Sequence, residues 1–502
     1  MDKGVLWGVG LCILLVGYGV EVKASHHHPY RKLQSLPTDQ EQPYRTAYHF
    51  QPLENWMNDP NGPVYYKGVY HLFYQYNPHA AVAFYISWGH SVSYNLVDWI
   101  QLEPALNPSE PYDSNGCWSG SITILPGEIP AILYTGINLE NRQVQNLAVP
   151  KNLSDPLLRE WVKSSYNPLM TPVNGIDPEQ DLTPLFEMNL PSTCSRQVSM
   201  VMTTTFWEIT RPKQNFLVDT DFLDGGFDFR YDYGKFYASK TFFDSAKKRR
   251  ILWAWVSESD TTLNAIRRGW AGIQAFPRSV LLSRTGQQLV QWPIKELEKL
   301  RANKVAFNDM ELKGGSVFEV SGITASQADV EVSFDLPNLN ETEFIDPNWV
   351  DPLVLCPKGA SLTGKGGPFG LLALASRDLT EQTAVFFRIF RKQDKYLVLM
   401  CSDQSRSSLG DGTDRTTYGV FINLDPRERK ISLRSLIDHS VIENFGADGR
   451  ACITARVYPT LAIHKEAHLY VFNNGTQSVR ISSLNAWSMK RAQIVPSEKN
   501  GK

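Results

Sequence analysis

The chain has 502 residues, and its 50 Lys and Arg residues nearly balance its 52 Asp and Glu residues, for a formal net charge of −2. Such a balance offers no attraction for nucleic acid or for an anionic membrane, which excludes the usual polyanion-binding classes. A hydrophobic fraction of 42% and a charged fraction of 20% exclude a disordered or coiled-coil chain. The 12% aromatic residues, 34 Gly and 30 Pro favour strands and turns, and the length favours two or more domains.

The N-terminus predicts entry into the secretory pathway. An uncharged, mostly apolar stretch over residues 4–20 follows Lys3 and precedes the small pair Ala24-Ser25, as in a signal peptide that occupies residues 1–24. The stretch is at the short limit for a membrane span, so a signal anchor is the alternative. We expect no membrane span once the signal peptide is removed.

The glycosylation sequons fit a secreted protein, and the number of cysteines limits its disulfides. N-glycosylation sequons begin at Asn152, Asn340 and Asn474. Five of the six cysteines lie beyond the signal peptide, an odd number that allows at most two disulfides and is too sparse for a disulfide scaffold. The His run at residues 26–28 lies in a polar segment typical of a solvated tail, so we predict no metal site.

Residues 44–292 show short aromatic or β-branched runs separated by Gly, Pro, Asn and Asp, which is typical of an all-β domain. Many short strands over about 250 residues permit a barrel, a large sandwich or a propeller, and periodicity does not choose among them. The clearest predicted strands cover residues 69–76, 121–125, 131–134, 251–256 and 279–282.

Residues 293–303 contain the sequence IKELEKLRAN, whose helix formers predict a short helical connector and a domain boundary. Beyond it, residues 304–495 return to short strand-like runs with turn signals between them, as in a sandwich of antiparallel strands. The predicted strands there cover residues 328–336, 369–375, 384–390, 396–401, 453–458 and 468–472.

The densest group of polar and aromatic residues is WMNDPNG at residues 56–62. By composition it indicates a turn, because Asn, Asp, Pro and Gly each favour turn geometry. The functional interpretation is that the Asp59 carboxylate, beside a Trp face and amide groups, suits a neutral polyol, since aromatic faces stack on sugars while amides bind hydroxyls. A retaining glycosidase would need a second carboxyl as general acid about 5 Å away.

Five segments together resemble the plant cell-wall invertases and fructan exohydrolases of glycoside hydrolase family 32. The segments are WMNDPNGP (56–63), WSGS (118–121), RYDYGKFYASKTF (230–242), GWAGIQ (269–274) and LMCSDQS (399–405). The resemblance implies a five-bladed β-propeller with an active site in its central funnel, then a β-sandwich. It also implies cofactor-free, retaining hydrolysis of β-fructofuranosides, with a sucrose or fructan substrate, in the apoplast or cell wall.

The same resemblance implies roles for individual residues. Asp59 would be the nucleophile, and Cys356 would pair with Cys401 in the sandwich. The fructose subsite would be lined by Trp56, Asn58, Gln75, Trp118 and Ser119.

Two catalytic motifs of the family are missing between Gly175 and Arg230. One is the Arg-Asp-Pro motif of the aspartate that stabilises the transition state, and Asp181 stands about where that aspartate is expected. The other is the Trp-Glu-Cys-Pro motif of the acid/base glutamate, of which Glu208 keeps only the Trp-Glu pair, so a solvated strand glutamate is the alternative. The segment is also much shorter than in the family, which predicts an incomplete blade, through deletion or an incorrectly joined transcript.

These departures leave three functional hypotheses. The chain is an active or impaired fructoside hydrolase, a non-catalytic protein that binds fructose or fructan, or an inert remnant. Substrate preference has its own marker, since invertases carry a Trp eight positions after the subsite glutamine, and Ala83 stands at that spacing from Gln75. Because that Trp helps to enclose the glucose of sucrose, its absence favours a fructan exohydrolase.

One further group has the residue types of a hydrolase triad. Asp438, His439 and Ser440 are consecutive, and adjacent residues on a strand point to opposite faces and cannot assemble into a triad. We therefore predict that they are part of a sandwich strand.

Overall fold

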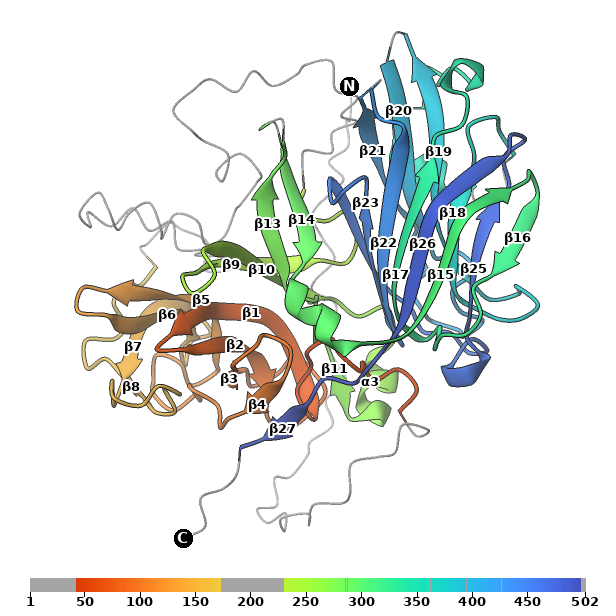
Figure 1. Cartoon of the computed structure of the whole chain (residues 1–502). Helices are drawn as coiled ribbons and strands as arrows, with labels where there is room; N and C mark the ends of the chain where they lie inside the picture. The colour runs from red at the N-terminus through yellow and green to blue at the C-terminus, as the bar shows by residue number, and fades with distance from the viewer. Residues whose placement is uncertain are drawn as a thin grey trace, which may run out of the picture. The chain divides into compact units, whose positions relative to one another are not determined.

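The computed structural model describes residues 42–172 and 230–497, apart from 285, 287, 350, 359, 361, 362, 394 and 426 (Figure 1). The predicted signal peptide and the candidates Asp181 and Glu208 lie outside the described residues. The described residues form five β-sheets, which confirms the all-β prediction. Their helices are short, and none of those in the described ranges is long and apolar enough to cross a membrane.

Three of the five sheets are built mainly from residues 55–293, which we call the first half of the chain, and β27 near the C-terminus joins one of them (Figure 1). The first sheet runs β11-β1-β2-β3-β4-β27, and its two outer strands pair in parallel with β1 and β4. Chain segments distant in sequence therefore close both of its edges. The strands are β1 (Asn55–Tyr66), β2 (Val69–Asn77), β3 (Ser87–Ser93), β4 (Trp99–Gln101), β11 (Trp270–Ala271) and β27 (Ile494–Pro496).

The other two sheets of this half are antiparallel, as expected of propeller blades. The second contains β5 (Gly116–Leu125), β6 (Ile129–Ile137), β7 (Gln143–Pro150) and β8 (Trp161–Lys163). The third contains β9 (Tyr237–Asp244), β10 (Arg249–Val256), β12 (Ile273–Gln274), β13 (Arg278–Leu282) and β14 (Leu289–Pro293). The helix α3 (Thr262–Arg268) connects β10 to β11 and ends at Gly269, whose positive φ of 77° suits a glycine.

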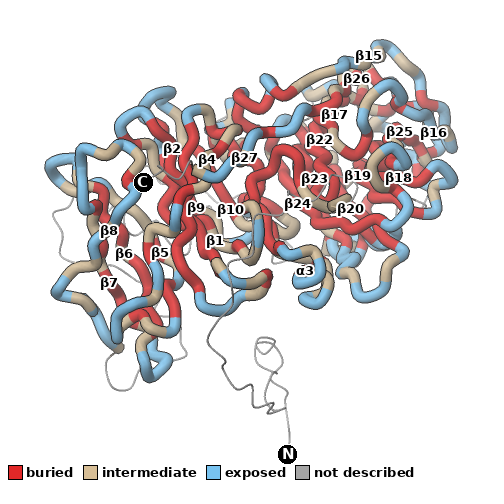
Figure 2. Tube along the Cα trace, turned by 90° about the horizontal axis from the view of Figure 1, so that it is seen from below, coloured by how far each residue is buried: buried red, intermediate tan, exposed pale blue. Residues whose placement is uncertain are grey.

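Aromatic side chains fill the spaces between these sheets. Every residue of β2 is buried because both faces of the strand are covered (Figure 2). Trp99 packs edge-to-face on Trp253, with ring centroids 5.6 Å apart, and so joins the first sheet to the third. Phe73 and Trp161 make a similar contact at 5.7 Å between the first and second sheets. Aromatic side chains thus pack these sheets against each other.

The connector between the halves is a 3₁₀-helix, η2 (Lys295–Leu300), and β15 begins directly at Arg301. Two six-stranded antiparallel sheets follow, in the orders β15-β26-β17-β22-β23-β24 and β16-β25-β18-β19-β20-β21. The bounds of these strands are β15 (Arg301–Leu312), β16 (Ser316–Glu319), β17 (Gln327–Asp335), β18 (Phe369–Ala375), β19 (Thr383–Lys392), β20 (Lys395–Asp403), β21 (Tyr418–Leu424), β22 (Lys430–Asp438), β23 (Val441–Gly446), β24 (Ala451–Arg456), β25 (His468–Asn473) and β26 (Val479–Met489). Their apolar side chains form one buried cluster that includes Phe334, Phe369 and Ile453, which confirms the predicted sandwich.

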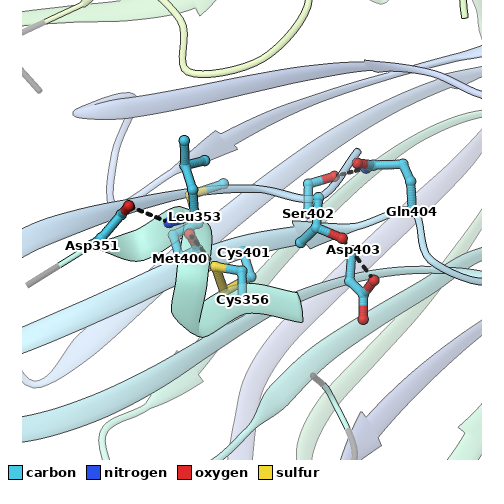
Figure 3. Close-up of a disulfide and its surroundings, with 9 residues drawn as sticks. Asp351, Leu353, Cys356, Met400, Cys401, Ser402, Asp403 and Gln404 are labelled. Atoms are coloured by element: carbon cyan, nitrogen blue, oxygen red, sulfur yellow. Dashed lines mark hydrogen bonds between the residues drawn. A yellow bond between two sulfur atoms is a disulfide. The ribbon is translucent and has the colours of Figure 1, made fainter. Parts of the chain in front are cut away.

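A disulfide joins Cys356 to Cys401, as the resemblance implied (Figure 3). Cys356 follows the short helix α4 (Pro352–Leu355), which Asp351 caps by accepting a hydrogen bond of 2.8 Å from the backbone N–H of Leu353. The disulfide packs closely on β21, because a Cβ added at Gly419 would lie 2.3 Å from the Cys356 sulfur. Cys117 and Cys452 are free and buried.

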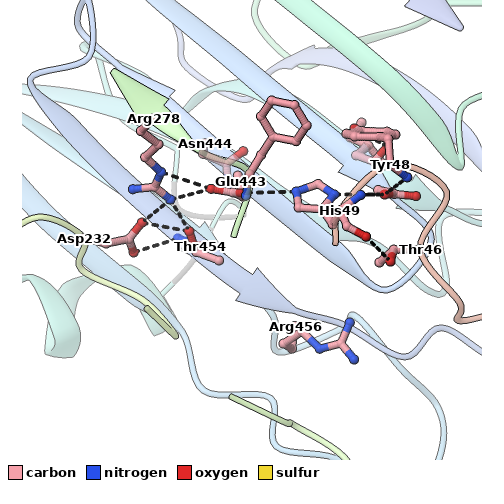
Figure 4. A network of polar contacts seen from close by, with 12 residues as sticks. Thr46, Tyr48, His49, Asp232, Arg278, Glu443, Asn444, Thr454 and Arg456 are labelled. Carbon is pink, nitrogen blue, oxygen red and sulfur yellow. Dashed lines mark hydrogen bonds and ion pairs between the residues drawn. The ribbon is translucent and has the colours of Figure 1, made fainter. Parts of the chain in front are cut away.

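The two halves meet in a buried set of ionic side chains, which we call the interface network (Figure 4). The His49 ring, in the segment before β1, lies 2.9 Å from Asp438 and 2.9 Å from Glu443. Arg278 of β13 also contacts Glu443, and it donates a 2.9 Å hydrogen bond to Asp232. These five side chains are fully or almost fully buried. The network therefore fixes strands β22–β24 of the sandwich to the first half of the chain.

Mutual pairing sets the charges of the interface network. Burial alone would lower the pKa of His49, but hydrogen bonds to Asp438 and Glu443 raise it to about 9. Burial would likewise raise the pKa of Glu443, but the Arg278 charge and the His49 hydrogen bond lower it to about 2. The pKa of Asp438 is also lowered, chiefly by His49, against the effect of burial. The network is thus charged at neutral pH.

The placement of residues 438–440 corrects part of one prediction. Asp438 is the last residue of β22, as predicted for a strand, but β23 begins only at Val441, so His439 and Ser440 lie outside both strands. They form the turn between these strands, with His439 at a φ of +55°. The Asp438 carboxylate accepts hydrogen bonds from three consecutive backbone N–H groups, those of residues 47–49, at 2.6, 2.9 and 2.9 Å. The sequence shows no glycine or proline there, so the turn was not recognised.

Candidate active site

The WMNDPNG motif is part of a strand, so the interpretation as a turn is wrong. The motif lies within β1, and its pairing with β2 is interrupted twice, between Met57 and Pro60 and between Asn61 and Val64. Pairing with β2 and β11 on the two sides of β1 outweighs the turn preference of the local sequence. Gly62 has a φ of +50°, and a Cβ there would lie 2.7 Å from Ile122 of β5. The glycine thus permits the close approach of β1 and β5.

Asp59 is held by neutral hydrogen-bond donors. The hydroxyl of Ser119 on β5 donates a 2.7 Å hydrogen bond to Oδ2, and the amide of Asn58 donates one of 3.1 Å to Oδ1. The indole N–H of Trp56 donates at 2.8 Å to the Asn58 side-chain oxygen, which sets the orientation of that amide. Burial raises the pKa of Asp59, and the hydrogen bonds from Ser119 and Asn58 act against that rise.

The remaining predicted site residues lie on β2 and β5 beside this group. Gln75 of β2 is buried and donates a 3.2 Å hydrogen bond to the carbonyl oxygen of Cys117, next to Trp118. The Trp118 carbonyl oxygen accepts a 2.9 Å hydrogen bond from the indole of Trp88, and the Trp118 side chain is 44% exposed. Asp59 and the five predicted residues of the fructose subsite thus lie on three strands of the structure, β1, β2 and β5.

Lys240 is a site residue to which sequence reasoning assigned no role, although it lies in the segment RYDYGKFYASKTF. It projects from β9, is 8% exposed, and its Nζ lies 3.5 Å from the Ser121 hydroxyl, two residues beyond Ser119. Burial lowers the pKa of Lys240 to about 8, and the charge of Asp59 acts against that shift. The sequence signal was its place in that segment, because the burial of Lys240 is a property of the folded chain.

Gln274 supports the backbone around Asp59. Its side chain is fully buried. The amide N–H group donates a 2.7 Å hydrogen bond to the Asn58 carbonyl oxygen and one of 3.0 Å to the Met57 sulfur. Gly272 of the same segment has a φ of +85°, and a Cβ there would lie only 1.7 Å from the Met57 carbonyl oxygen. The segment GWAGIQ therefore fixes β1 at Met57 and Asn58, next to Asp59.

Glu258 binds the backbone of Gly272, and its lowered pKa does not suit a general acid. Its carboxylate accepts a 2.6 Å hydrogen bond from the Gly272 N–H and pairs with Arg456 at 3.1 Å. Burial would raise its pKa, but the Arg456 charge and a hydrogen bond from Tyr458 lower it. A general acid must hold its proton at the working pH, so Glu258 does not fit that role.

Comparison with known proteins agrees with this geometry. The sequence matches the family description "Glycosyl hydrolases family 32 N-terminal domain" over residues 49–183 and 185–293. It matches "Glycosyl hydrolases family 32 C terminal" over residues 296–488. The chain belongs to glycoside hydrolase family 32. The match to the N-terminal domain is interrupted at residue 184. This position lies between Gly175 and Arg230, where two catalytic motifs are missing.

Relatives of known name are similar over most of the chain. An insoluble β-fructofuranosidase isoenzyme, CWINV3 of Arabidopsis thaliana, is 46% identical over 569 residues, with 96% of this chain and 94% of the relative covered. The alignment is longer than the 502 residues of this family 32 chain, so the relative contains segments that this chain lacks. A fructan 6-exohydrolase of Beta vulgaris is 49% identical, with 90% and 88% covered.

Among solved structures, fructan 1-exohydrolase IIa of Cichorium intybus superimposes with a TM-score of 0.81 at 46% identity, covering 91% of this chain and 99% of that chain. A further structure of that enzyme is a complex with 1-kestose. This similarity establishes the fold of this family 32 chain as a β-propeller followed by a β-sandwich, to which the sheets described above belong.

Proposed function

We propose that this chain is a secreted hydrolase that releases fructose from β-fructofuranosides with retention of configuration, and that Asp59 is its nucleophile. The observation that carries the proposal is the Asp59 carboxylate, which Ser119 and Asn58 hold by hydrogen bonds of 2.7 and 3.1 Å. Two fixed donors orient the carboxylate oxygens for attack without adding a permanent charge. Membership in family 32 and the names of the relatives support the same reaction.

In the proposed reaction an Asp59 oxygen attacks the anomeric carbon of fructose, and the glycosidic carbon–oxygen bond breaks. The leaving-group oxygen takes a proton from a general acid. Water, activated by the same group as base, then releases fructose and regenerates the Asp59 carboxylate. The amides of Asn58 and Gln75 and the rings of Trp56 and Trp118 suit the hydroxyls and the C–H face of the sugar.

The proposed reaction also requires a general acid and a carboxylate that stabilises the transition state. We assign Glu208 to this role and Asp181 to stabilisation of the transition state, and both lie outside the described residues. Without an effective acid the rate would fall by about 10²- to 10⁴-fold.

A second candidate function is binding of fructose or fructan without turnover. The location of the polar groups favours it. The sugar-binding groups lie on β1, β2 and β5, whereas the Glu258 carboxylate pairs with Arg456. Binding requires only the groups on these three strands, whereas catalysis requires a further carboxyl.

We also propose secretion to the cell wall and a preference for fructan over sucrose. The apolar stretch in residues 1–24 supports export, and several relatives are named as insoluble or cell-wall enzymes. Ala83 at the eighth position after Gln75 supports the preference for fructan. Faster release of fructose from sucrose than from inulin or levan at equal concentration would overturn that preference.

The deciding experiment compares hydrolysis and binding in the purified chain. We expect fructose release from inulin or levan, and a loss of about 10⁴-fold or more in kcat for Asp59→Asn, since the nucleophile is removed. Asp309→Asn is the control, because Asp309 lies on the sandwich with 66% of its side chain exposed. Turnover that survives in Asp59→Asn would contradict the role of Asp59. Saccharide binding without turnover in the unmodified chain would favour the second function.

A further inference from the structure

A small pocket lies on the outer face of the second sandwich sheet. It is lined by Phe386 and Phe390 of β19, Leu399 of β20, and Trp349 from the segment before β18. Alternate residues of a strand point to opposite faces, and the residues of β19 between these phenylalanines belong to the core between the two sheets. The pocket therefore has a mainly apolar lining, as is typical of sites that bind small molecules.

Arg388 interrupts this apolar surface. It lies between Phe386 and Phe390 on β19, opposite Leu399 of β20, and its side chain is only 13% exposed. A charge in such surroundings is costly unless its hydrogen-bonding groups have partners. The Nη2 group donates a 3.0 Å hydrogen bond to Glu343, but the buried Nε has no hydrogen-bond partner within the described part of the chain. The guanidinium thus lines the pocket without a full set of acceptors.

Lys358 brings a second cation to the pocket. It is the last residue of the 3₁₀-helix η4 (Cys356–Lys358), and it lines the pocket together with Arg388. The Lys358 Nζ lies 5.8 Å from the centre of the Trp349 ring, and the guanidinium carbon of Arg388 lies 5.9 Å from the same ring. The Glu343 carboxylate, whose side chain is 38% exposed, balances one of these charges. One positive charge is left at the pocket.

An aromatic surface with one excess positive charge fits a small aromatic monocarboxylate. A carboxylate supplies the acceptors for Arg388 and Lys358, and hydrogen bonds between charged partners are the stronger kind. An aromatic ring packs well against Trp349 and Phe390. A sugar acid fits less well, because its hydroxyl groups would face Phe and Leu side chains that offer them no hydrogen bonds.

We propose that this pocket is a second binding site of the protein, and that its ligand is a small aromatic carboxylate. Arg388 binds the carboxylate group, and Trp349 contacts the ring. The pocket is built from the sandwich, whereas Asp59 and its neighbours lie on β1, β2 and β5 of the first half. The inference is therefore independent of the proposed hydrolysis, and its test does not require turnover.

The test is calorimetric titration of the purified whole chain with trans-cinnamate. Cinnamamide, which has a neutral amide in place of the carboxylate, measures the contribution of the ligand charge, and galacturonate represents the sugar acids. We expect cinnamate to bind, and both other probes to bind about ten-fold more weakly or less. Arg388→Leu should weaken the binding of cinnamate by about ten-fold or more. The variant should fold, because leucine suits the apolar surroundings and the partly exposed Glu343 can be hydrated.

The matched control is Arg391→Leu on the same strand. The guanidinium carbon of Arg391 lies 4.3 Å from the centre of the exposed Phe344 ring, so this arginine also contacts an aromatic ring, but it is not among the residues that line the pocket. We expect its affinity for cinnamate to be unchanged. A chain that does not bind cinnamate, an Arg388→Leu variant that binds it equally well, or equal or tighter binding of cinnamamide or galacturonate would overturn the inference.

Discussion

Two groups of carboxylates in this molecule differ in the partners that surround them. In the candidate active site, Asp59 accepts hydrogen bonds from the neutral side chains of Ser119 and Asn58, and its pKa is raised. In the interface network, Asp438 and Glu443 face His49 and Arg278, and the pKa of each carboxyl is lowered. Burial acts in the same direction in both places.

The partners of a carboxylate determine whether it suits a reaction or a structural contact. A carboxylate that is paired with a cation is stabilised as an anion and is a poor nucleophile, whereas one held by hydroxyl and amide donors keeps its basicity. Pairing also makes the interface network costly to break, because removal of one ion leaves a buried charge without its partner. We therefore propose that the candidate active site serves reaction with a ligand, whereas the network holds the two halves together.

The largest effect is expected from Arg278→Leu in the interface network. This change leaves Glu443 and Asp232 without their shared cation in a fully buried position, so we expect a loss of about 3–5 kcal/mol in the free energy of unfolding. Urea denaturation measures the loss. Arg480→Leu is the control, because Arg480 pairs with Asp309 on the surface, where both side chains are more than half exposed, and about 0.5 kcal/mol is expected. Equal effects of the two changes would contradict the comparison.

The pH dependence of stability gives the next largest effect. The pKa of His49 is about 9 in the folded chain, against about 6.5 when unfolded, so its contribution is complete below pH 6.5 and is lost as the pH rises through 9. We expect a loss of about 3 kcal/mol between pH 6.5 and pH 9.5 in the free energy of unfolding.

The variant His49→Gln should be less stable at pH 6.5 and should lack this part of the pH dependence. Denaturation of both proteins at the two pH values measures the difference. A slope that is the same in the variant and in the unmodified chain would show that His49 is not the group responsible.

The smallest effect is expected from Lys240→Gln beside Asp59. The charge of Lys240 lowers the pKa of Asp59, so its removal should raise that pKa further. The acidic limb of the kcat/KM profile for fructan should then move to higher pH, with activity several-fold lower at pH 4.5 and little change near pH 7. Lys240→Arg, which keeps the charge, is the matched control. An acidic limb that stays in place in Lys240→Gln would contradict the coupling.

Much of the fold was predictable because strand patterns are local. The run at 369–375 is apolar along its whole length, and it forms β18 over Phe369–Ala375 with every residue buried. The disulfide between Cys356 and Cys401 followed from resemblance alone, since cysteine counting left several pairings open. The Asp59 site could be located for the same reason, through a specific motif.

Predictions failed where long-range pairing outweighed local preference. WMNDPNG has the composition of a turn but lies in β1, because β2 and β11 pair with it from both sides. Lys240 was assigned no role because Asp59 of β1 and Ser121 of β5, with which it interacts, lie more than a hundred residues earlier. The role of Asp438 was missed in the same way, since it binds the backbone of residues 47–49.

Residue types, strand spacing and family motifs are local properties, and from them the sequence settled the all-β class, the two halves of the chain and the position of Asp59. The ionisation of each carboxylate depended on the tertiary structure. Asp59 and Asp438 are the same residue type with the same intrinsic acidity, yet burial among neutral donors raises one pKa and contact with His49 lowers the other. Partners nearly 400 residues apart create that difference, and only the folded chain brings them together.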